Sequence, residues 1–510
     1  MLENRSFDHM LGALKAFDTS IDGIDPQHPG INFDEKNQQT FSQQDVAATF
    51  VRPDFKVPHE FDDVQEQIRD GMGHFVDAYC HANQQAPATD GDQVMGYFPD
   101  GALPVLHALA KNFLVCDRWF SSMPGPTWPN RLFAHSGTSL GDVLMPDGVL
   151  STVRMFFGRY SQPTIYDRLD DKQIPWKIYH GGVPQSIVLN RLKPQLFSSR
   201  FQSMDGFVAD CAGPEQAFPS YAFIEPRYFA GLAGEENDQH SPAGVVAGEQ
   251  LIADVYNAIR KNQALWESTL LIVTYDEHGG FYDHVLPPPT IAPDDHTDIH
   301  AFDRLGVRVP AILVSPWVAR GVDHTVYDHT SILRYVCEKW QLPHLCRRTQ
   351  PAFGANVTGN FASAISLAKA RTDTPPPSFA GAPRLAALAA TGPADFGDAQ
   401  TALVSYAELV RQEIDAQAMQ ASGKSMLAAR AVPAAGVPPV DQRAKAIEQW
   451  MIDAKQVEPV PVSNAQIALP QATVAVAPAG SAPLPAASGP VVAAKATGGR
   501  SNGKKRPQRA

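Results

Sequence analysis

The stretch that decides the fold is LLIVTYDEHGG, residues 270 to 280. It begins with apolar and β-branched residues that are typical of a strand buried on both faces. It ends in Asp276, Glu277 and His278, which two glycines follow. In an open parallel sheet, ligands bind just beyond the carboxyl ends of the strands. We therefore predict that a buried strand presents two carboxylates and an imidazole at such an edge.

Two neighbouring carboxylates are costly to bury unless a cation or hydrogen-bond donors neutralise them. A metal ion explains the pair Asp276 and Glu277, and an exposed acidic turn is the alternative. The opening stretch MLENRSFDHMLG adds two oxygen ligands, Glu3 and Asn4, unless it is a solvated N-terminal arm. Together the four residues form an all-oxygen set, which suits a hard divalent cation better than a Cys/His zinc site.

Strands and helices alternate over roughly the first 340 residues. KNFLVCDRWF (111–120) and RVPAILVSPW (308–317) have the composition of buried strands. GVVAGEQLIADVYNAIRKNQALW (244–266) has apolar residues at helical spacing and leads into the strand that begins at Leu270. A helix followed by a buried strand is typical of a parallel sheet covered on both faces. The predicted fold class is therefore α/β with a mostly parallel central sheet.

A second chemical signal is SSMPGPTWPNRLFAHSGTS, residues 121 to 139. Its prolines and glycine enforce a turn, after which NRLFAHSG resembles the start of a helix. Thr127 is thus predicted near a helix N-terminus, where the dipole and free N–H groups favour a phosphate-like anion. Its hydroxyl is a candidate nucleophile if a metal ion lowers its pKa, and the alternative is a simple helix N-cap.

Several histidines are candidate phosphate donors or acids for a leaving group: His59, His240, His284 and His329. Any one of them alone is more often structural or solvated than catalytic.

Composition excludes several classes of protein. The formal net charge of −12 argues against a nucleic-acid partner, although the last residues are locally basic. The five cysteines contain no CxxC pair and are too sparse for a disulfide scaffold. No segment approaches the ~20 apolar residues of a membrane span, so only peripheral contact with a membrane stays open. The chain shows no signal-peptide pattern, and neither its compartment nor its oligomeric state follows from the sequence.

The amino-acid composition and the predicted elements of the chain change near residue 350. We predict a catalytic domain over 1–350 and a linker with amphipathic helices over 351–456. The Ala/Pro/Val-rich end, 457–510, is predicted to be a disordered tail.

Several long motifs, taken in order, resemble a known family. They are LENRSFDHMLG, PTWPNRLFAHSGTS, EPRY…NDQH, TYDEHGGFYDHV, FDRLGVRVPAILVSPW and YDHTSILR. The set resembles the phosphoesterase family that contains non-haemolytic phospholipases C, plant non-specific phospholipases C and acid phosphatase A. The resemblance covers roughly residues 1 to 345. It implies an alkaline-phosphatase-like α/β/α sandwich and a hydrolase that acts on phosphate esters.

The resemblance also implies roles for individual residues. The family's metal ligands fall on Glu3, Asn4, Asp276 and Glu277, its nucleophile on Thr127, and two phosphate-contacting histidines on His59 and His240. His180 is a weaker match to a further histidine, and His278 and His284 are neighbours of the site. One divalent metal ion is the implied cofactor.

The implied reaction is a phospholipase C-type cleavage of phospholipids through a phospho-threonine intermediate. The alternatives are an acid phosphatase for small monoesters and an inactive remnant that acts as a binding module. The last is motivated by the family's short hydrophobic strand ahead of the LENRSFDH motif, which this chain lacks, so that it looks truncated there. Around His59 the family tends to show Asp-Pro-x-His, where this chain has KVPH. TWPNR also fits a sulfatase-like T-x-P-x-R pattern, but threonine cannot give the formylglycine that sulfatases need.

Overall fold

The structure is a computed structural model of the chain. It describes residues 1–46, 57–84, 88–146, 159–232, 234–241, 244–354, 358–379, 398–421 and 438–456. All of these residues belong to one compact unit, Met1–Pro459. The predicted disordered tail, 457–510, lies outside the described residues, and so does part of the predicted linker.

A four-stranded sheet forms the centre of the fold. Its strands, in spatial order, are β11 (Gly321–Asp323), β5 (Leu114–Cys116), β10 (Ala311–Val314) and β9 (Leu271–Thr274). β11 runs parallel to β5, whereas β10 is antiparallel to both β5 and β9. Every residue of β5 and β10 is buried, as expected of short apolar strands that are covered on both faces.

A second sheet continues the first across the N-terminal residues. Its strands are all parallel, in the order β7 (Phe201–Ser203), β6 (Trp176–His180) and β8 (Tyr221–Glu225). Leu2 forms a parallel bridge with Tyr275, just beyond β9, and the amino group of Met1 donates to the Ile224 carbonyl oxygen of β8 at 3.2 Å. The first two residues of the chain therefore lie between β9 and β8.

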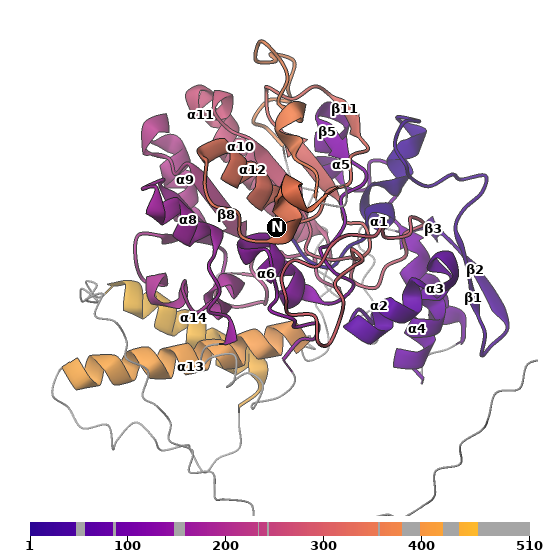
Figure 1. Cartoon of the computed structure of the whole chain (residues 1–510), viewed down its shortest axis with the longest axis horizontal. Helices are drawn as coiled ribbons and strands as arrows, with labels where there is room; N and C mark the ends of the chain where they lie inside the picture. The colour runs from indigo at the N-terminus through magenta and orange to yellow at the C-terminus, as the bar shows by residue number, and fades with distance from the viewer. Residues whose placement is uncertain are drawn as a thin grey trace, which may run out of the picture. The chain divides into compact units, whose positions relative to one another are not determined.

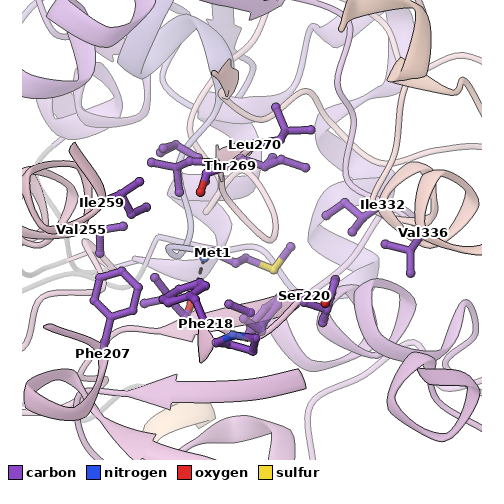
Figure 2. A pocket seen from close by; sticks show the side chains of 18 of the residues that line it. Met1, Phe207, Phe218, Ser220, Val255, Ile259, Thr269, Leu270, Ile332 and Val336 are labelled. Atoms are coloured by element: carbon purple, nitrogen blue, oxygen red, sulfur yellow. Dashed lines mark hydrogen bonds between the residues drawn. The ribbon is translucent and has the colours of Figure 1, made fainter. Parts of the chain in front are cut away.

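Helices cover both faces of these strands, which confirms the predicted α/β sandwich. Parallel pairings predominate over the two sheets taken together, although β10 is antiparallel to both of its neighbours. Side chains of α10 (Val246–Lys261) lie on one side of the space between β8 and β9, and those of α12 (Thr330–Trp340) lie on the other (Figure 2). α10 packs against α5 (Pro104–Asn112), and α12 packs against α6 (Thr127–Ser136). α10 is amphipathic, since its buried residues recur at helical spacing along one side.

A smaller layer beside the core carries the segment around His59. The α2 to α4 helices gather next to the β1–β2 hairpin (Figure 1). The buried side chain of Asn32 joins them, because its oxygen accepts from the Phe75 N–H at 2.7 Å and its nitrogen donates to the Met72 carbonyl at 3.0 Å. The elements of this layer are β1 (Ile31–Asp34), β2 (Gln39–Ser42), β3 (Gln44–Asp45), β4 (Gly96–Tyr97), α2 (Phe61–Gln67), α3 (Arg69–Met72) and α4 (Phe75–Ala82).

Two long helices follow near the C-terminal end, where the sequence predicts amphipathic helices. α13 (Asp398–Ala421) and α14 (Val440–Gln456) pack against each other. They contact the preceding part of the chain, for example through Lys193 and Glu413, whose charged atoms lie 3.0 Å apart. The division into 1–350, 351–456 and 457–510 stays a prediction.

The remaining elements are short. They are α1 (Phe7–Leu11), α8 (Ile165–Asp171), α9 (Met204–Ala212), α11 (Gln263–Glu267) and the 3-10 helices Gly12–Ala16, Ala88–Met95, Gln185–Val188, Lys193–Gln195, Glu215–Ala217, Arg347–Thr349, Pro351–Phe353 and Phe361–Ala364. Among the described residues, no helix has the length and apolar character needed to cross a lipid bilayer.

Candidate active site

The opening residues of the chain lie against the carboxyl end of β9. The backbone N–H of Asn4 donates to Asp276 Oδ1 at 3.0 Å, and that of Arg5 donates to the Glu277 carbonyl at 3.0 Å. Asn4 has a φ of 61°, a left-handed conformation that asparagine tolerates better than most residues. Glu3 and Asn4 are both fully buried, so the opening stretch is not a solvated arm.

The amide of Asn4 is oriented by hydrogen bonds at both of its ends. Its nitrogen lies 3.2 Å from His59 Nε2, and its oxygen accepts from the Thr127 hydroxyl at 3.3 Å. The other ring nitrogen of His59 lies 2.8 Å from the Val57 carbonyl, which only accepts. Neutral His59 therefore carries its proton on Nδ1 and accepts from Asn4 at Nε2. This arrangement turns the Asn4 oxygen toward Thr127.

Thr127 is the first residue of α6 and is buried. The N-cap of the helix is Pro126, and the Thr127 hydroxyl makes no capping bond, so the N-cap interpretation is wrong. Asn130 holds the turn ahead of the helix, because its side chain accepts from the Met123 N–H at 3.0 Å and donates to the Gly125 carbonyl at 2.9 Å. The hydroxyl thus projects from a fixed turn at the positive end of a helix.

Arg131, one turn further along α6, binds two of the buried carboxylates. Its guanidinium lies 3.2 Å from Glu3 Oε1 and 3.0 Å from Asp276 Oδ2, and it also donates to the Tyr228 hydroxyl at 2.9 Å. Gln185 donates to the same oxygen of Glu3 at 2.5 Å. One guanidinium therefore neutralises two carboxylates, Glu3 and Asp276. Glu277, which lies next to Asp276 in the chain, belongs to the same buried group.

Three carboxylate oxygens in this group have no hydrogen-bond partner within the part of the chain that the structure describes. They are Glu3 Oε2, Glu277 Oε1 and Asp238 Oδ2, and all three residues are fully buried. Glu277 uses its other oxygen to accept from the Gly279 N–H at 2.6 Å. Asp238 uses its other oxygen for the His240 N–H at 3.1 Å, and its carbonyl accepts from the Glu3 N–H at 2.9 Å.

Burial raises the pKa of Glu3 and of Glu277 to about 8, and it raises the pKa of Asp238 well above its usual value. Arg131 acts in the opposite direction on Glu3 but does not outweigh burial. Unpaired buried carboxylates are expensive, and a cation is the group that removes that cost. The donors are all oxygens, which fits a hard divalent ion. The residues present thus fit the implied metal.

The histidines divide into two groups. The rings of His59 and His240 lie 5.8 Å apart, and His59 Nε2 lies 3.9 Å from Glu277 Oε1. Burial, followed by the nearby His59, lowers the pKa of His240 to about 3, so His240 is neutral. The structure therefore brings both of these histidines to the carboxylate group.

The neighbouring histidines contact other parts of the chain. His278 packs beside Glu277, but its Nε2 lies 2.8 Å from Gln67 Oε1, which joins the site to α2. Burial lowers the pKa of His278 to about 3. His180, at the end of β6, contacts the Gly182 carbonyl at 2.6 Å. His329 Nε2 lies 2.5 Å from the Asp276 carbonyl, so it supports the backbone that carries the carboxylates.

His284 belongs to a separate cluster. Its ring nitrogens lie 2.8 Å from Asp8 and 3.2 Å from Asp22. Asp8, Asp283 and His284 have ligand atoms close enough together to hold a metal ion. Arg308 already supplies positive charge there, at 2.8 Å from Asp283 and 3.2 Å from Asp8. This cluster is therefore a buried ion-pair network, distinct from the group around Glu3.

Sequence reasoning missed Arg131, Gln185 and Asp238. Arg131 and Asp238 lie in motifs that the sequence analysis quotes for other residues, PTWPNRLFAHSGTS for Thr127 and EPRY…NDQH for His240. Gln185 has no local signal, because only the fold brings it to Glu3.

Comparison with known proteins identifies the family. The Phosphoesterase family matches residues 1–343. The chain belongs to the phosphoesterase family. It is a hydrolase acting on phosphate esters, of the phospholipase C type.

Among its relatives is non-specific phospholipase C6 of Arabidopsis thaliana, which is 36% identical over 400 residues and matches 74% of this chain and 73% of its own length. Non-specific phospholipase C4 of the same organism is 32% identical over 73% of this chain and 72% of its own length. Phospholipase C B of Mycobacterium tuberculosis strain H37Rv is 28% identical over 74% of this chain and 79% of its own length. A solved structure of a protein in the alkaline phosphatase superfamily from Vibrio parahaemolyticus overlaps only loosely, with a TM-score of 0.29, 13% identity and coverage of 51% of this chain and 64% of that one.

Proposed function

We propose that this phosphoesterase cleaves phospholipids as a phospholipase C, with Thr127 as the nucleophile and one divalent cation as the cofactor. The single observation that carries the proposal is the contact of 3.3 Å between the Thr127 hydroxyl and the Asn4 amide oxygen. That contact joins a hydroxyl at a helix N-terminus to a group of buried carboxylates in which Glu3, Glu277 and Asp238 each have one oxygen without a hydrogen-bond partner among the described residues.

The cation would be held by Glu3, Asn4, Asp276 and Glu277, with Asp238 as a further oxygen donor. When bound, it supplies the positive charge that lowers the pKa of the Thr127 hydroxyl and polarises the phosphoryl group. The orientation of Asn4 supports its place in this set, since His59 holds the amide nitrogen and leaves the oxygen toward Thr127.

Thr127 would act by attack on phosphorus in line with the leaving group. A bond forms between Thr127 Oγ1 and phosphorus, and the bond from phosphorus to the diacylglycerol oxygen breaks. The hydroxyl proton passes to solvent, and the leaving oxygen takes a proton from water. Water then hydrolyses the phospho-threonine, which releases the phosphorylated head group. The positive end of α6 favours the negative charge that develops on the phosphoryl oxygens.

The two histidines are suited to different tasks. His240 is neutral at physiological pH, because burial and the nearby His59 lower its pKa to about 3. It can hydrogen-bond a phosphoryl oxygen, but it does not hold a proton to donate. The side chain of His59 is 16% exposed, and its ring holds the Asn4 amide nitrogen through Nε2 and the Val57 carbonyl through Nδ1. We assign to His59 the positioning of Asn4, and the leaving oxygen takes its proton from water.

The substrate class is taken from the relatives, which are named phospholipases C. We infer that the leaving group is diacylglycerol and that the protein meets its substrate through peripheral contact with a lipid surface.

The test compares Thr127→Ala with Thr127→Ser on phosphatidylcholine vesicles, with added divalent cation and with chelator. Thr127→Ala should lose at least about 10⁴-fold in kcat, as removal of a catalytic nucleophile does. Thr127→Ser keeps a hydroxyl at the same position and should retain measurable turnover. Mass spectrometry after a rapid acid quench should find a phosphocholine group on residue 127 of the wild-type chain.

Three results would lead to a different function. Retention of most of the rate by Thr127→Ala would remove the nucleophile assignment. Faster cleavage of p-nitrophenyl phosphate than of phosphatidylcholine would indicate an acid phosphatase that acts on monoesters. A folded chain with no turnover of either substrate and no phosphorylated threonine would indicate a binding module.

A further inference from the structure

Glu225 is a fully buried carboxylate to which the proposed mechanism gives no role. It is the last residue of β8 and lies at the carboxyl end of that strand. Its oxygens accept from the Gln185 N–H at 2.6 Å, from the Ser186 N–H at 3.2 Å and from the Tyr228 hydroxyl at 2.8 Å. Glu225 therefore holds two separate parts of the chain, the start of the 3-10 helix Gln185–Val188 and the side chain of Tyr228.

The first of these parts brings Gln185 to the candidate active site. The two N–H groups that Glu225 binds are the first two of the 3-10 helix, and such leading N–H groups have no partner within their own helix. With this backbone held, the Gln185 side chain donates to Glu3 Oε1 at 2.5 Å. Glu225 thus fixes the point from which the Gln185 amide reaches Glu3.

The second part, Tyr228, orients Arg131. Burial raises the pKa of Tyr228 well above its usual value, so the hydroxyl keeps its proton and donates it to Glu225. The same hydroxyl accepts from Arg131 Nη1 at 2.9 Å. The other nitrogens of the guanidinium then lie 3.2 Å from Glu3 Oε1 and 3.0 Å from Asp276 Oδ2.

Both donors consequently bind the same oxygen of Glu3. Arginine frequently binds a carboxylate through two parallel N–H···O bonds, one to each oxygen. Such a pair between Arg131 and Glu3 would occupy both oxygens. Tyr228 prevents it, because the hydroxyl holds one branch of the guanidinium. Glu3 Oε1 therefore receives Arg131 and Gln185, whereas Oε2 has no hydrogen-bond partner among the residues that the structure describes.

We propose that Glu225 is a positioning residue for the cation site. Through Gln185 and Tyr228 it directs both donors to Oε1 of Glu3 and keeps Oε2 available to a divalent cation. The inference rests on the proposed function, in which Glu3 is one of the ligands. A purely structural Glu225 would only join β8 to the 3-10 helix, and its replacement would lower stability without changing the affinity of the folded chain for a cation.

The experiment measures the binding of Mn²⁺ to the metal-free 510-residue chain by calorimetric titration, without substrate. Tyr228→Phe removes only the hydroxyl and releases Arg131, which can then bind both oxygens of Glu3. The Mn²⁺ affinity should fall at least about tenfold, the size of effect that the loss of an outer hydrogen-bond partner has on metal binding. Glu225→Gln replaces an accepting oxygen by a donor and disturbs both links, so its loss of affinity should be at least as large. Circular dichroism should show unchanged helix content in both variants.

Tyr179→Phe is the matched control. Tyr179 is also buried, and its hydroxyl donates to the carboxylate of Asp210 at 2.6 Å. This bond joins β6 to α9 and includes none of the groups that bind Glu3. The variant loses a similar hydrogen bond, but its Mn²⁺ affinity should stay within about twofold of the wild-type value.

A double variant separates positioning from packing. Arg131→Met removes the guanidinium that Tyr228 holds. If Tyr228 acts on the cation site through Arg131, adding Tyr228→Phe to Arg131→Met should change the Mn²⁺ affinity less than about twofold. An equal loss from Tyr228→Phe with and without Arg131 would show that Tyr228 acts through packing alone, and the proposal would be wrong.

Unchanged Mn²⁺ affinity in both Tyr228→Phe and Glu225→Gln would also overturn the proposal. Glu3→Gln keeps this failure apart from a failure of the proposed function. If the wild-type chain binds Mn²⁺ and Glu3→Gln weakens binding, Glu3 remains a ligand whatever the other variants show. Absence of Mn²⁺ binding by the wild-type chain, or unchanged affinity in Glu3→Gln, would overturn both proposals.

Discussion

Replacement of Arg131 by methionine gives the sharpest test of how the buried carboxylates are held. The side chain of Arg131 is 4% exposed and lies 3.2 Å from Glu3 and 3.0 Å from Asp276, both of which are fully buried. Methionine has a similar shape, so the change removes the charge with little loss of volume. Breaking a buried ion pair by removal of one partner costs about 3–5 kcal/mol, because the remaining charge is left without compensation. We expect a loss of that size in the free energy of unfolding of the metal-free chain.

The matched control is Arg411→Met in α13. Arg411 is 42% exposed and lies 3.6 Å from Asp415 in an i,i+4 pair. Exposed helix pairs of this type contribute about 0.3–0.5 kcal/mol. Urea unfolding of the two variants can be followed by tryptophan fluorescence. The loss in the free energy of unfolding should be several-fold larger for Arg131→Met than for Arg411→Met, and the slope of that free energy against urea concentration should be unchanged.

Two further observations follow from the same argument. The loss in Arg131→Met should be largest above about pH 8 and should shrink as the pH falls below that value, since burial raises the pKa of Glu3 and Glu277 to about 8 and their protonation removes the uncompensated charge. A divalent cation should also stabilise Arg131→Met more than it stabilises the wild-type chain, because the variant has more negative charge to neutralise. A loss below about 1 kcal/mol, equal to that of Arg411→Met and independent of pH, would refute the reasoning.

Three other outcomes can be measured with the same protein. Burial acts to lower the pKa of His284, but the hydrogen bonds with Asp22 and Asp8 outweigh it and raise the pKa to about 10. Because this folded-state pKa lies above the unfolded value, the stability that His284 contributes is complete below about pH 6.5. This contribution is lost as the pH rises toward 10. In His284→Asn, the midpoint of thermal unfolding should therefore vary less with pH between about 6.5 and 10 than it does in the wild-type chain. Asp238→Asn should weaken Mn²⁺ binding at least tenfold in calorimetric titration with no loss of helical circular dichroism, and unchanged affinity would remove Asp238 from the ligand set. Chelation should abolish phosphodiesterase turnover reversibly and lower the unfolding midpoint, and turnover that survives exhaustive dialysis against chelator would contradict a resident cation.

The central strands and the helix that carries Thr127 could be predicted because their signals are local. A run such as LLIV (270–273) is apolar throughout, and the prolines around Thr127 limit the chain to a turn followed by a helix. The antiparallel direction of β10 could not be predicted in this way. Its residues, Ala311–Val314, are as apolar as those of a parallel strand, and direction depends on how the chain returns to the sheet.

The candidate site shows the same division between local and non-local signals. Glu3, Asn4, Asp276 and Glu277 belong to motifs with recognisable spacing, and the structure brings them into contact, although their roles stay predictions. Residues that reach the site only through tertiary packing have no signal in their local sequence. Gln185 is one of these, because it reaches Glu3 only through the 3-10 helix that follows β6.

The balance of charge at the site leaves the choice between a diester and a monoester to other observations. Four buried carboxylates (Glu3, Asp238, Asp276 and Glu277) surround the candidate site, and the guanidinium of Arg131 contacts two of them. The buried guanidinium of Arg5 also interacts with Asp238, so a divalent cation would bring these groups close to electrical neutrality. The preference for a diester therefore rests on the phospholipase C relatives, and the comparison of phosphatidylcholine with p-nitrophenyl phosphate tests it directly.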